Sequence, residues 1–478
     1  MSLWEKDIMM KSYDPLKENK VVDILIVGGG MTGINSLYFL KDQKNVMLVE
    51  ANKIGQGVSL NTTGKINYLQ ESTLGHLILT KQYTKAKIYL ASQIEGIKLL
   101  KKIIKMEQIE CNLEEVTSYL VTQKAEKVQD IKQIEHFLED IKIPLENDLS
   151  LLDKDFLYGI GVKDTFVFHP LKYLKGLLNV IKHPIYEHTR IMNIRKTQNG
   201  YQCVTDQGYY IEAKRVMIAC HYPFFYLPYF LPTKTSIEKS YLNAYKVKEN
   251  KKYTYITIEN PSLSTRFYED NQHIYQLALG GSHKTSVKQN DSEQFQKITT
   301  SKLKNILWSN VDICTFDHMP IIGPIKENLY LATGYQAWGM IQSVISAQMF
   351  YQSINGKHSP YDDLFSPHRT FIKRFLFSFP YLLSNAYSFL RSKWYHKSWY
   401  SNHLTFSYKK GRLIACYKDK NGEKHLVHPV CQHMKCGLIF NEIEETWDCP
   451  CHSSRFDKDG NIIKGPSKYS IQWSENSD

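Results

Sequence analysis

Hydrophobic and polar positions change their spacing along the chain, and each spacing predicts a different element. Val22–Val27 is apolar at every position except one, as in a buried parallel strand, and Asn45–Val49 repeats this pattern. Apolar residues over His76–Leu152 recur every three or four positions, which predicts amphipathic helices, as at Ile88, Ile94, Ile97 and Leu100. Tyr253–Leu279 alternates and is rich in tyrosine, isoleucine and threonine, which predicts sheet.

Length and composition are those of a globular protein with more than one domain. The 478 residues are too many for one compact core, so two or three domains are expected. No apolar run approaches the roughly 20 residues that a membrane-spanning helix needs. Met1–Lys20 is polar and mixed in charge and lacks the apolar stretch of a secretory signal. We therefore expect a cytoplasmic protein.

The formal charge of +12 is spread over the whole chain, which favours a compositional bias over a specific anionic partner. One segment departs from this pattern, because Leu364–Lys418 holds ten Lys or Arg and no Asp or Glu. Its part 371–400 is also dense in aromatics. We favour a linker whose aromatics pack between domains; the alternative is contact with an anionic membrane at its inner face. No nucleic-acid recognition motif accompanies the charge.

A glycine-rich turn follows the first predicted strand. The sequence from Gly28 to Gly33 is G-x-G-x-x-G, and a helical stretch, a second strand and Glu50 come after it. Gly28 permits a tight turn, Gly30 lets the backbone approach a pyrophosphate, and Gly33 lets the helix pack on the strand. Glu50 is placed to accept hydrogen bonds from a ribose diol. This order predicts a dinucleotide-binding unit.

Cysteine and histidine cluster near the C-terminal end. Cys431-x-His433 is followed, after fifteen residues, by Cys449-x-x-His452. Two thiolates and two imidazoles suit a metal centre, and zinc is one possibility. Each pair supplies one residue of each type, however, which suits a binuclear iron cluster with Cys₂ on one iron and His₂ on the other.

The segment Phe406–Trp473 resembles Rieske 2Fe–2S domains, through C-x-H followed by C-P-C-H. The resemblance implies that Cys431 and Cys449 bind one iron and that His433 and His452 bind the other. It further implies a disulfide and a proline-containing loop over the cluster, formed respectively by Cys436 with Cys451 and by Gly465-Pro466. Ser454 matches a serine of high-potential relatives, but Phe456 stands in place of their tyrosine. We therefore predict a lower potential than that of respiratory-chain Rieske proteins.

Residues 21–369 resemble the FAD-dependent oxidoreductases of the amino-acid-oxidase type. The matching pieces are, in order, Ile54–Lys65, Phe168–Leu174, Arg215–His221, Asp317–Pro324 and Leu331–Met340. The resemblance implies FAD as the cofactor, bound with the help of Thr63, Gly64, Gly334, Gly339 and Met340. It implies an α/β fold, in which a Rossmann-like FAD domain carries a β-sheet substrate domain, followed by a small all-β Rieske domain.

These resemblances predict how the chain is divided. We expect an oxidoreductase over 1–370, a basic aromatic linker over 371–405 and the Rieske domain over 406–478. Within the oxidoreductase, the dinucleotide-binding parts lie near 20–75, 165–235 and 310–369, and the substrate or cap parts near 76–160 and 236–305.

The resemblances also imply a function. A small substrate, of the amine or amino-acid class, would be oxidised with FAD, and electrons would leave through the cluster to an external protein or quinone. The alternatives are an electron-transfer relay or reductase component for a partner protein, and a redox sensor. Lys65 and His169 are acid–base candidates by position, and a structural role is the alternative for both. Arg266 is a candidate for binding a carboxylate or another anion, and a solvated surface role is its alternative.

Overall fold

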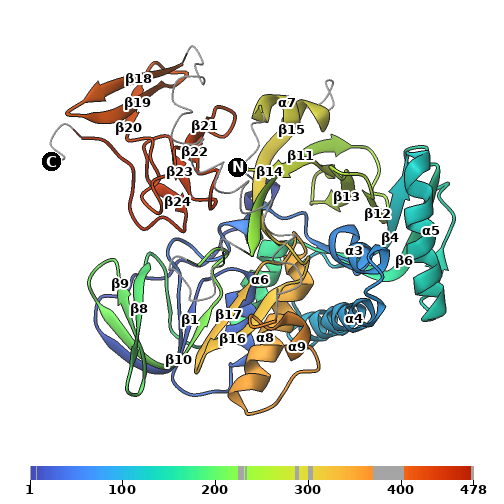
Figure 1. The fold of residues 1–478 in the computed structure, drawn as a ribbon, viewed down its shortest axis with the longest axis horizontal. Coiled ribbons are helices and arrows are strands. Elements are labelled where there is room, and N and C mark those ends of the chain that lie inside the picture. Colours follow the sequence, from blue (N-terminus) through green and yellow to red (C-terminus); the bar gives the residue numbers. More distant parts are fainter. Residues whose placement is uncertain are drawn as a thin grey trace. The chain divides into compact units, whose positions relative to one another are not determined.

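The first apolar run forms a central strand of a sheet. In the computed structural model, β1 (Lys20–Val27) lies between β2 (Val46–Val49) and β10 (Tyr210–Ile218) and runs parallel to both. Figure 1 shows these strands beside β16 and β17. The order is β16-β17-β10-β1-β2-β7. The remaining members are β7 (Ile185–Tyr186), β8 (Ile191–Thr197), β9 (Gly200–Thr205), β16 (Ile321–Lys326) and β17 (Leu329–Thr333).

The structure describes residues 2–6, 8–223, 231, 234–285, 290–299, 305–369 and 403–474. The chain forms two compact units. One comprises Met1–His221, Lys239–His283 and Glu293–Arg369, and the other comprises Tyr222–Glu238, Lys284–Ser292 and Thr370–Asp478. The predicted linker 371–405 lies outside the described residues except for its last three. Among the described helices, none is both long and apolar enough to cross a membrane.

A second, larger sheet contains the alternating segment, as predicted. Its order is β15-β11-β14-β13-β12-β4-β6-β3, with β5 beside β6. The bounds are β3 (Lys65–Ile66), β4 (Glu114–Thr122), β5 (Leu145–Glu146), β6 (Tyr158–Val167), β11 (Thr235–Val247), β12 (Tyr253–Thr257), β13 (Ser264–Glu269), β14 (Ile274–Lys284) and β15 (Asn305–Thr315).

The prediction of helices throughout 76–152 is wrong at two places, where the strands β4 and β5 interrupt it. The longer one, β4, pairs parallel with β12 and antiparallel with β6. Its sequence EEVTSYLVT is rich in β-branched residues and buries Val116, Tyr119 and Val121. The strands that pair with β4 come later in the chain, so the local sequence does not show them. The helical spacing of the flanking segments therefore extended the helix prediction across β4.

Helices cover these sheets. The helix predicted after the glycine turn is α1 (Met31–Phe39), and Gly30 is its N-cap. The others are α2 (Val58–Asn61), α3 (His76–Leu79), α4 (Tyr83–Met106), α5 (Ala125–Asp140), α6 (Pro170–Val180), α7 (Asp291–Lys297), α8 (Gly339–Ile354) and α9 (Asp362–Phe365). Two short turns of 3-10 and π type, Leu3–Glu5 and Glu71–Gly75, complete the helical elements of the described residues.

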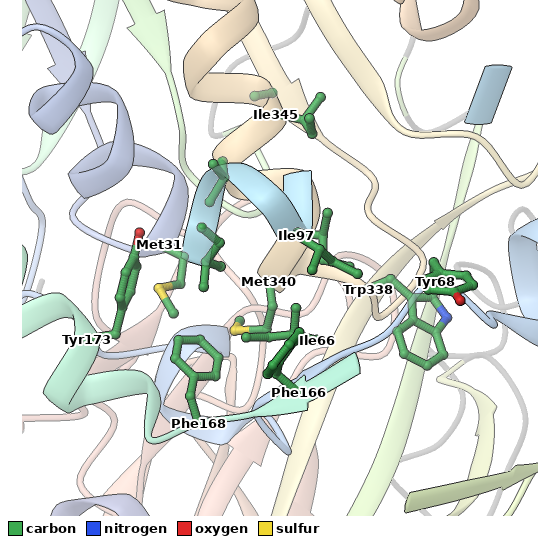
Figure 2. Close-up of a cluster of buried hydrophobic side chains, with 14 of the residues drawn as sticks. Met31, Ile66, Tyr68, Ile97, Phe166, Phe168, Tyr173, Trp338, Met340 and Ile345 are labelled. Carbon is green, nitrogen blue, oxygen red and sulfur yellow. The ribbon is translucent and has the colours of Figure 1, made fainter. Parts of the chain in front are cut away.

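The apolar core lies where α1, α4, α6 and α8 meet the sheets. Figure 2 shows Met340 of α8 between Phe168 and Ile66, with Met31 and Tyr173 on one side. All five side chains are buried. Helix α8 packs on both α1 and α4, so these three helices form one layer of the core.

The C-terminal unit is built from two small antiparallel sheets. One contains β18 (Leu404–Lys409), β19 (Arg412–Lys418) and β20 (Lys424–Val427). The other contains β21 (Ile439–Asn441), β22 (Thr446–Asp448), β23 (Arg455–Asp457) and β24 (Ile462–Lys464). The fold class is therefore as predicted: α/β, with a small all-β domain near the C-terminal end.

Candidate functional site

The glycine-rich turn is packed so tightly that side chains have no room there. Gly28 has φ +114°, and a Cβ atom at this residue would lie 2.8 Å from the carbonyl oxygen of Ala219. A Cβ atom on Gly33 would lie 1.8 Å from the carbonyl oxygen of Gly28. The turn therefore brings β1, β10 and α1 into backbone contact, as a dinucleotide-binding unit requires.

Ser59 is a residue of this site that the sequence did not reveal. Its hydroxyl oxygen accepts a hydrogen bond from the backbone N–H of Met31, the first residue of α1, at 3.0 Å. A Cβ atom on Gly30 would lie 3.2 Å from the same oxygen. The amide end of α1 thus faces a polar group and a cradle without side chains, which suits an approaching phosphate.

Glu50 is fixed by backbone N–H groups. Its Oε2 accepts from Gly29 N at 2.6 Å and its Oε1 accepts from Asn52 N at 2.8 Å. Burial raises the pKa of this carboxyl, and the two backbone hydrogen bonds oppose the rise. Each carboxylate oxygen keeps a second lone pair, so Glu50 can still accept from a ribose hydroxyl.

Arg266 holds the loop that precedes β3. Its Nη1 donates to the carbonyl oxygens of Thr63, Gly64 and Phe168, at 2.7, 3.1 and 3.0 Å. The residue is 1% exposed, so the alternative of a solvated surface arginine is wrong. Burial lowers the pKa of the guanidinium to about 9. Arg266 acts here as an anchor for the loop that carries Thr63 and Gly64.

His169 caps helix α6. Its ring Nδ1 accepts a hydrogen bond from the backbone N–H of Lys172 at 3.2 Å. Its backbone N–H donates to the carbonyl oxygen of Cys111 at 2.7 Å. The residue is fully buried, which lowers the pKa of the imidazole to about 3. The structure thus gives His169 a structural contact, the alternative kept for it.

Lys65 is the third candidate, and its surroundings still allow a role in proton transfer. The ammonium is buried and contacts the hydroxyl of Ser264, and it lies 5.5 Å from the centre of the Trp338 ring. Burial lowers its pKa to about 8, although the charge of Glu71 opposes the shift. A lysine with such a pKa exchanges a proton near neutral pH.

The segment that leads into α8 combines a turn with a helix start. Gly334 has φ +72°, and the neighbouring Thr333 hydroxyl donates to the carbonyl of His221 at 2.6 Å. Gly339 is the first residue of α8, as predicted. The Met340 side chain points into the apolar core, so its backbone N–H is the part left for a cofactor.

The first residues of the chain also brace this region, although their polar composition gave no sign of it. Trp4 is fully buried, and its Nε1 donates to the carbonyl of Thr62 at 2.7 Å. The Ser2 hydroxyl donates to the carbonyl of Leu60 at 2.8 Å. The loop 60–64 is therefore fixed from both ends, by the N-terminal turn and by Arg266.

In the C-terminal unit, the two predicted cysteine ligands lie together. Both are buried, at 1% exposure for Cys431 and 2% for Cys449. Contact with the Cys449 thiol lowers the pKa of Cys431 to about 7, helped by the N–H groups of His433 and Met434 and by the Ser454 hydroxyl. Hydrogen bonds that favour the thiolate suit a metal-binding sulfur.

The two predicted histidine ligands face the same place. The ring centres of His433 and His452 are 5.0 Å apart, with an angle of 88° between their planes. Burial lowers the pKa values to about 4 and about 3, so both imidazoles are neutral at pH 7, as ligation requires. Nδ1 of His452 is buried and has no hydrogen-bond partner among the described residues, which fits a bond to metal.

The surroundings of these four ligands also match a cluster site. Cys436 and Cys451 form a disulfide, and their sulfurs lie within 4.8 Å of the Cys449 sulfur. The Ser454 hydroxyl accepts from the backbone N–H of Ser467 at 2.9 Å, which holds the loop after Gly465-Pro466 against the second ligand pair. Two soft sulfurs and two neutral imidazoles fit a Rieske cluster.

Other residues of the same unit border the second ligand loop. The ring of Tyr222 lies 5.4 Å from the ring of His452, centre to centre. The Thr285 hydroxyl donates to the carbonyl of Pro450 at 2.6 Å. Ser453, within the loop, has φ +63°, a region that favours glycine and costs other residues roughly 1 kcal/mol.

Comparisons with known proteins agree with this division. A model of the FAD dependent oxidoreductase family matches residues 23–352, and a model of the Rieske 2Fe-2S domain matches residues 398–473. The chain is 30% identical to the Bacillus subtilis (strain 168) protein named "Putative Rieske 2Fe-2S iron-sulfur protein YhfW". The alignment covers 97% of this chain and 95% of that protein.

Solved structures show the same fold for the first unit. Glycine oxidase from Geobacillus kaustophilus has a TM-score of 0.62 at 16% identity, covering 74% of this chain and 100% of that one. L-proline dehydrogenase from P. horikoshii has a TM-score of 0.60 at 15% identity, covering 75% and 99%. The chain thus belongs to the FAD-dependent oxidoreductase family, and over residues 398–473 it carries a Rieske 2Fe–2S domain.

Proposed function

We propose that this protein is a dehydrogenase that oxidises an amine or an amino acid and delivers the electrons, through its Rieske domain, to an external acceptor. The observation that carries the proposal is that one chain holds both a dinucleotide-binding turn and a Cys₂His₂ cluster site. Bound FAD supplies two-electron chemistry, and a bound 2Fe–2S cluster supplies one-electron transfer. An enzyme that reduces oxygen directly has no need of the second group.

The substrate class rests on likeness of fold. Two of the structures with this fold are named as a glycine oxidase and an L-proline dehydrogenase, both of which take an amino acid. Only one dinucleotide fingerprint, Gly28 to Gly33, is present in the sequence. This supports a small organic electron donor rather than NAD(P)H.

We assign roles to the residues on the same basis. Gly28, Gly30, Gly33 and Glu50 hold the dinucleotide, and the loop at Thr63 and Gly64 lies beneath the flavin, fixed by Arg266. Gly334, Gly339 and Met340 close the site. Lys65 is the group placed to hold or release a proton. Cys431, His433, Cys449 and His452 bind the cluster. The domain limits proposed are 1–370, 371–405 and 406–478.

The electron acceptor is proposed to be a protein or a quinone that meets the exposed edge of the histidine ligands. Burial, and after it the charge of Lys468, lowers the pKa of His433, so a lysine lies near this edge. An acceptor with an acidic surface or an anionic group is therefore favoured. The cytoplasm is the proposed location, and contact with a membrane would fall to 371–400, outside the described residues.

The test is spectroscopic and anaerobic. Purified holoprotein is mixed with single amines and amino acids, and visible and electron paramagnetic resonance spectra are recorded before and after dithionite. We expect one compound to bleach the flavin and to produce the signal of a reduced His-ligated cluster. Reduction by dithionite but by no small molecule would favour a relay that takes electrons from a partner protein.

A ligand variant separates the two cofactors. Cys449→Ser removes one cluster ligand, so the same compound should still bleach the flavin while the cluster signal is absent. The exposed Tyr469, at 62% exposure, supplies the control: Tyr469→Phe should leave both spectra unchanged. If folded protein contains zinc at the Cys–His site and neither iron nor flavin, the proposal is wrong.

A further inference from the structure

The residues that follow strand β10 are fixed at the nucleotide site. Ala219, the first residue beyond the strand, donates its backbone N–H to the carbonyl oxygen of Val27 at 2.8 Å. The carbonyl oxygen of Ala219 is the atom that a Cβ on Gly28 would approach to 2.8 Å. Two residues later, the carbonyl oxygen of His221 accepts from the Thr333 hydroxyl at 2.6 Å. This stretch is therefore held by the glycine turn and by the segment that leads into α8.

The next residue, Tyr222, belongs to the compact unit that carries the cluster ligands. Its ring centre lies 5.4 Å from that of His452, with 53° between the ring planes. Such a separation is that of two packed aromatic rings, and Tyr222 is buried, at 7% exposure. Three peptide bonds thus separate Ala219, beside the glycine turn, from a ring that packs on a predicted cluster ligand.

A second segment fixes the same ligand loop. Thr285 directly follows β14, and its hydroxyl donates to the carbonyl oxygen of Pro450 at 2.6 Å. The backbone N–H of Thr285 donates to the carbonyl oxygen of Ile237, a residue of β11, at 3.0 Å. Pro450 stands between the predicted ligands Cys449 and His452 in the sequence. The loop that supplies one ligand to each iron is therefore held in one position beside Tyr222.

The two histidine ligands have different neighbours. Burial and the charge of Lys468 lower the pKa of His433, whereas burial and the charge of His433 lower the pKa of His452. Lys468 therefore lies on the side of His433, while Tyr222 packs on His452. Because the two imidazole planes are at 88° to each other, the site has one face beside an aromatic ring and another beside a cation.

This asymmetry suits a site that receives electrons on one side and releases them on the other. The rate of electron transfer falls steeply with distance, and it falls less steeply through bonded atoms and packed rings than across solvent. The covalent chain from Ala219 to Tyr222, followed by one ring contact, is such a path. The side of His433 lies beside a lysine, which attracts an acceptor of negative charge.

We propose that Tyr222 is the residue through which electrons enter the cluster, by way of His452, and that they leave it on the side of His433 and Lys468. This inference rests on the proposed transfer from flavin to cluster and adds its route. One electron moves at a time: the reduced flavin loses it, and one iron changes from the ferric to the ferrous state. No covalent bond forms or breaks, and Tyr222 itself is neither oxidised nor reduced.

The test needs no knowledge of the substrate. In anaerobic holoprotein with EDTA, a flash of blue light reduces the bound flavin, because the excited flavin oxidises EDTA, and absorbance then follows flavin and cluster. We expect the wild-type cluster to be reduced as the flavin is reoxidised. Tyr222→Leu removes the ring contact and should slow this transfer by about tenfold or more, since geometric losses on the order of 1 Å have effects of this size. Tyr222→Phe keeps the ring and should transfer at the wild-type rate.

Two further readouts separate a route from a merely structural role. The reduction potential of the cluster, titrated by electron paramagnetic resonance, should be the same in the wild type and in Tyr222→Leu. Oxidation of the reduced cluster by ferricyanide should also be unchanged in this variant, because the anion takes the electron on the side of His433. Lys468→Met should slow that oxidation by roughly threefold at low salt, because a positive charge steers an anion, and should leave the transfer from the flavin unchanged.

A matched control is the exposed Tyr469 of the same unit, at 62% exposure, where Tyr469→Leu should transfer at the wild-type rate. If Tyr222→Leu holds less iron or flavin, Tyr222→Met takes its place, because methionine fills irregular buried space. The inference is overturned if the aliphatic variant transfers as fast as the wild type at equal cofactor content. It is also overturned if Lys468→Met leaves the reaction with ferricyanide unaffected. If the wild type does not reduce its cluster after the flash, the proposed function is wrong as well.

Discussion

The nucleotide turn and the cluster site are built from opposite parts of the amino acid. The turn presents backbone N–H groups, and its residues Gly28 and Gly33 are useful because they have no side chain. The cluster site presents the sulfur and imidazole atoms of Cys431, His433, Cys449 and His452. A site made from backbone is damaged by adding atoms, whereas a site made from side chains is damaged by removing them. Each of the following variants tests this difference.

The largest effect is expected from one added methyl group. In Gly33→Ala, the new Cβ would lie 1.8 Å from the carbonyl oxygen of Gly28, so β1 and α1 must separate. We expect loss of bound flavin at unchanged iron content, measured by absorbance and by metal analysis. The control is Gly356→Ala. Its φ is also positive, at +67°, but among the described residues no atom beyond the chain neighbours would lie within 4 Å of the new Cβ. Normal flavin content in Gly33→Ala would contradict this view of the turn.

Removing the disulfide should affect the unit that carries the cluster ligands. Cys436 and Cys451 are 15 residues apart, and closing such a loop stabilises a fold by about 3 kcal/mol. In the double variant Cys436→Ser/Cys451→Ser, the iron signal should be lost at a lower urea concentration. Flavin release should occur at the same urea concentration as in the wild type. If both transitions shift together, the two units do not unfold independently and the prediction is wrong.

Acid should weaken the nucleotide half through His169. Its pKa is about 3 in the folded chain and about 6.5 when unfolded, so the unfolded state binds more protons between these values. The contribution of the neutral His169 to the free energy of unfolding is fully present above pH 6.5, and it is lost as the pH falls toward the folded-state value. Between pH 7 and pH 5 the expected loss is about 2 kcal/mol.

His169→Asn isolates this contribution, because asparagine can still cap α6 but does not titrate. We expect the urea midpoint of flavin release to fall less steeply between pH 7 and pH 5 in this variant. His136, whose side chain is 78% exposed, supplies the control, and His136→Asn should keep the wild-type slope. Equal slopes in all three proteins would remove His169 from the explanation.

The smallest expected effect is a change in the reduction potential of the cluster, whose site is built from side chains. Phe456 is buried among the cluster cysteines, and Phe456→Tyr would add a hydroxyl near a ligand sulfur. One such hydrogen bond should raise the reduction potential by about 60 mV, the one-electron equivalent of about 1.4 kcal/mol. Ser454→Ala should lower it, because the Ser454 hydroxyl contacts Cys431. Redox titration followed by electron paramagnetic resonance measures both, and an unchanged potential in both would contradict the predicted tuning.

The parts of both sites that are close in sequence could be predicted from it. Strand, turn and α1 are contiguous, and the cluster ligands lie within 22 residues of each other. The contacts that complete the sites join distant residues. Arg266 reaches the Thr63 carbonyl across 203 positions, and Trp4 reaches Thr62 across 58. The spacing of residues along the chain indicates neither which side chain is buried nor which distant carbonyl accepts its hydrogen bond. For the same reason it did not indicate β4, whose partner strands are distant in sequence.

The order of strands in the first sheet has a consequence for biosynthesis. Strand β1 ends at Val27, but its neighbour β10 begins at Tyr210 and β17 ends at Thr333. At about 20 residues per second, roughly 15 s pass between translation of the glycine turn and that of the last parallel strand. The strands of the Rieske domain, β18 to β24, emerge within about 3 s of each other. Flavin loading must therefore wait until translation has reached Thr333 of the 478 residues. For roughly 9 s of that time the apolar strand β1 lacks its neighbour β10.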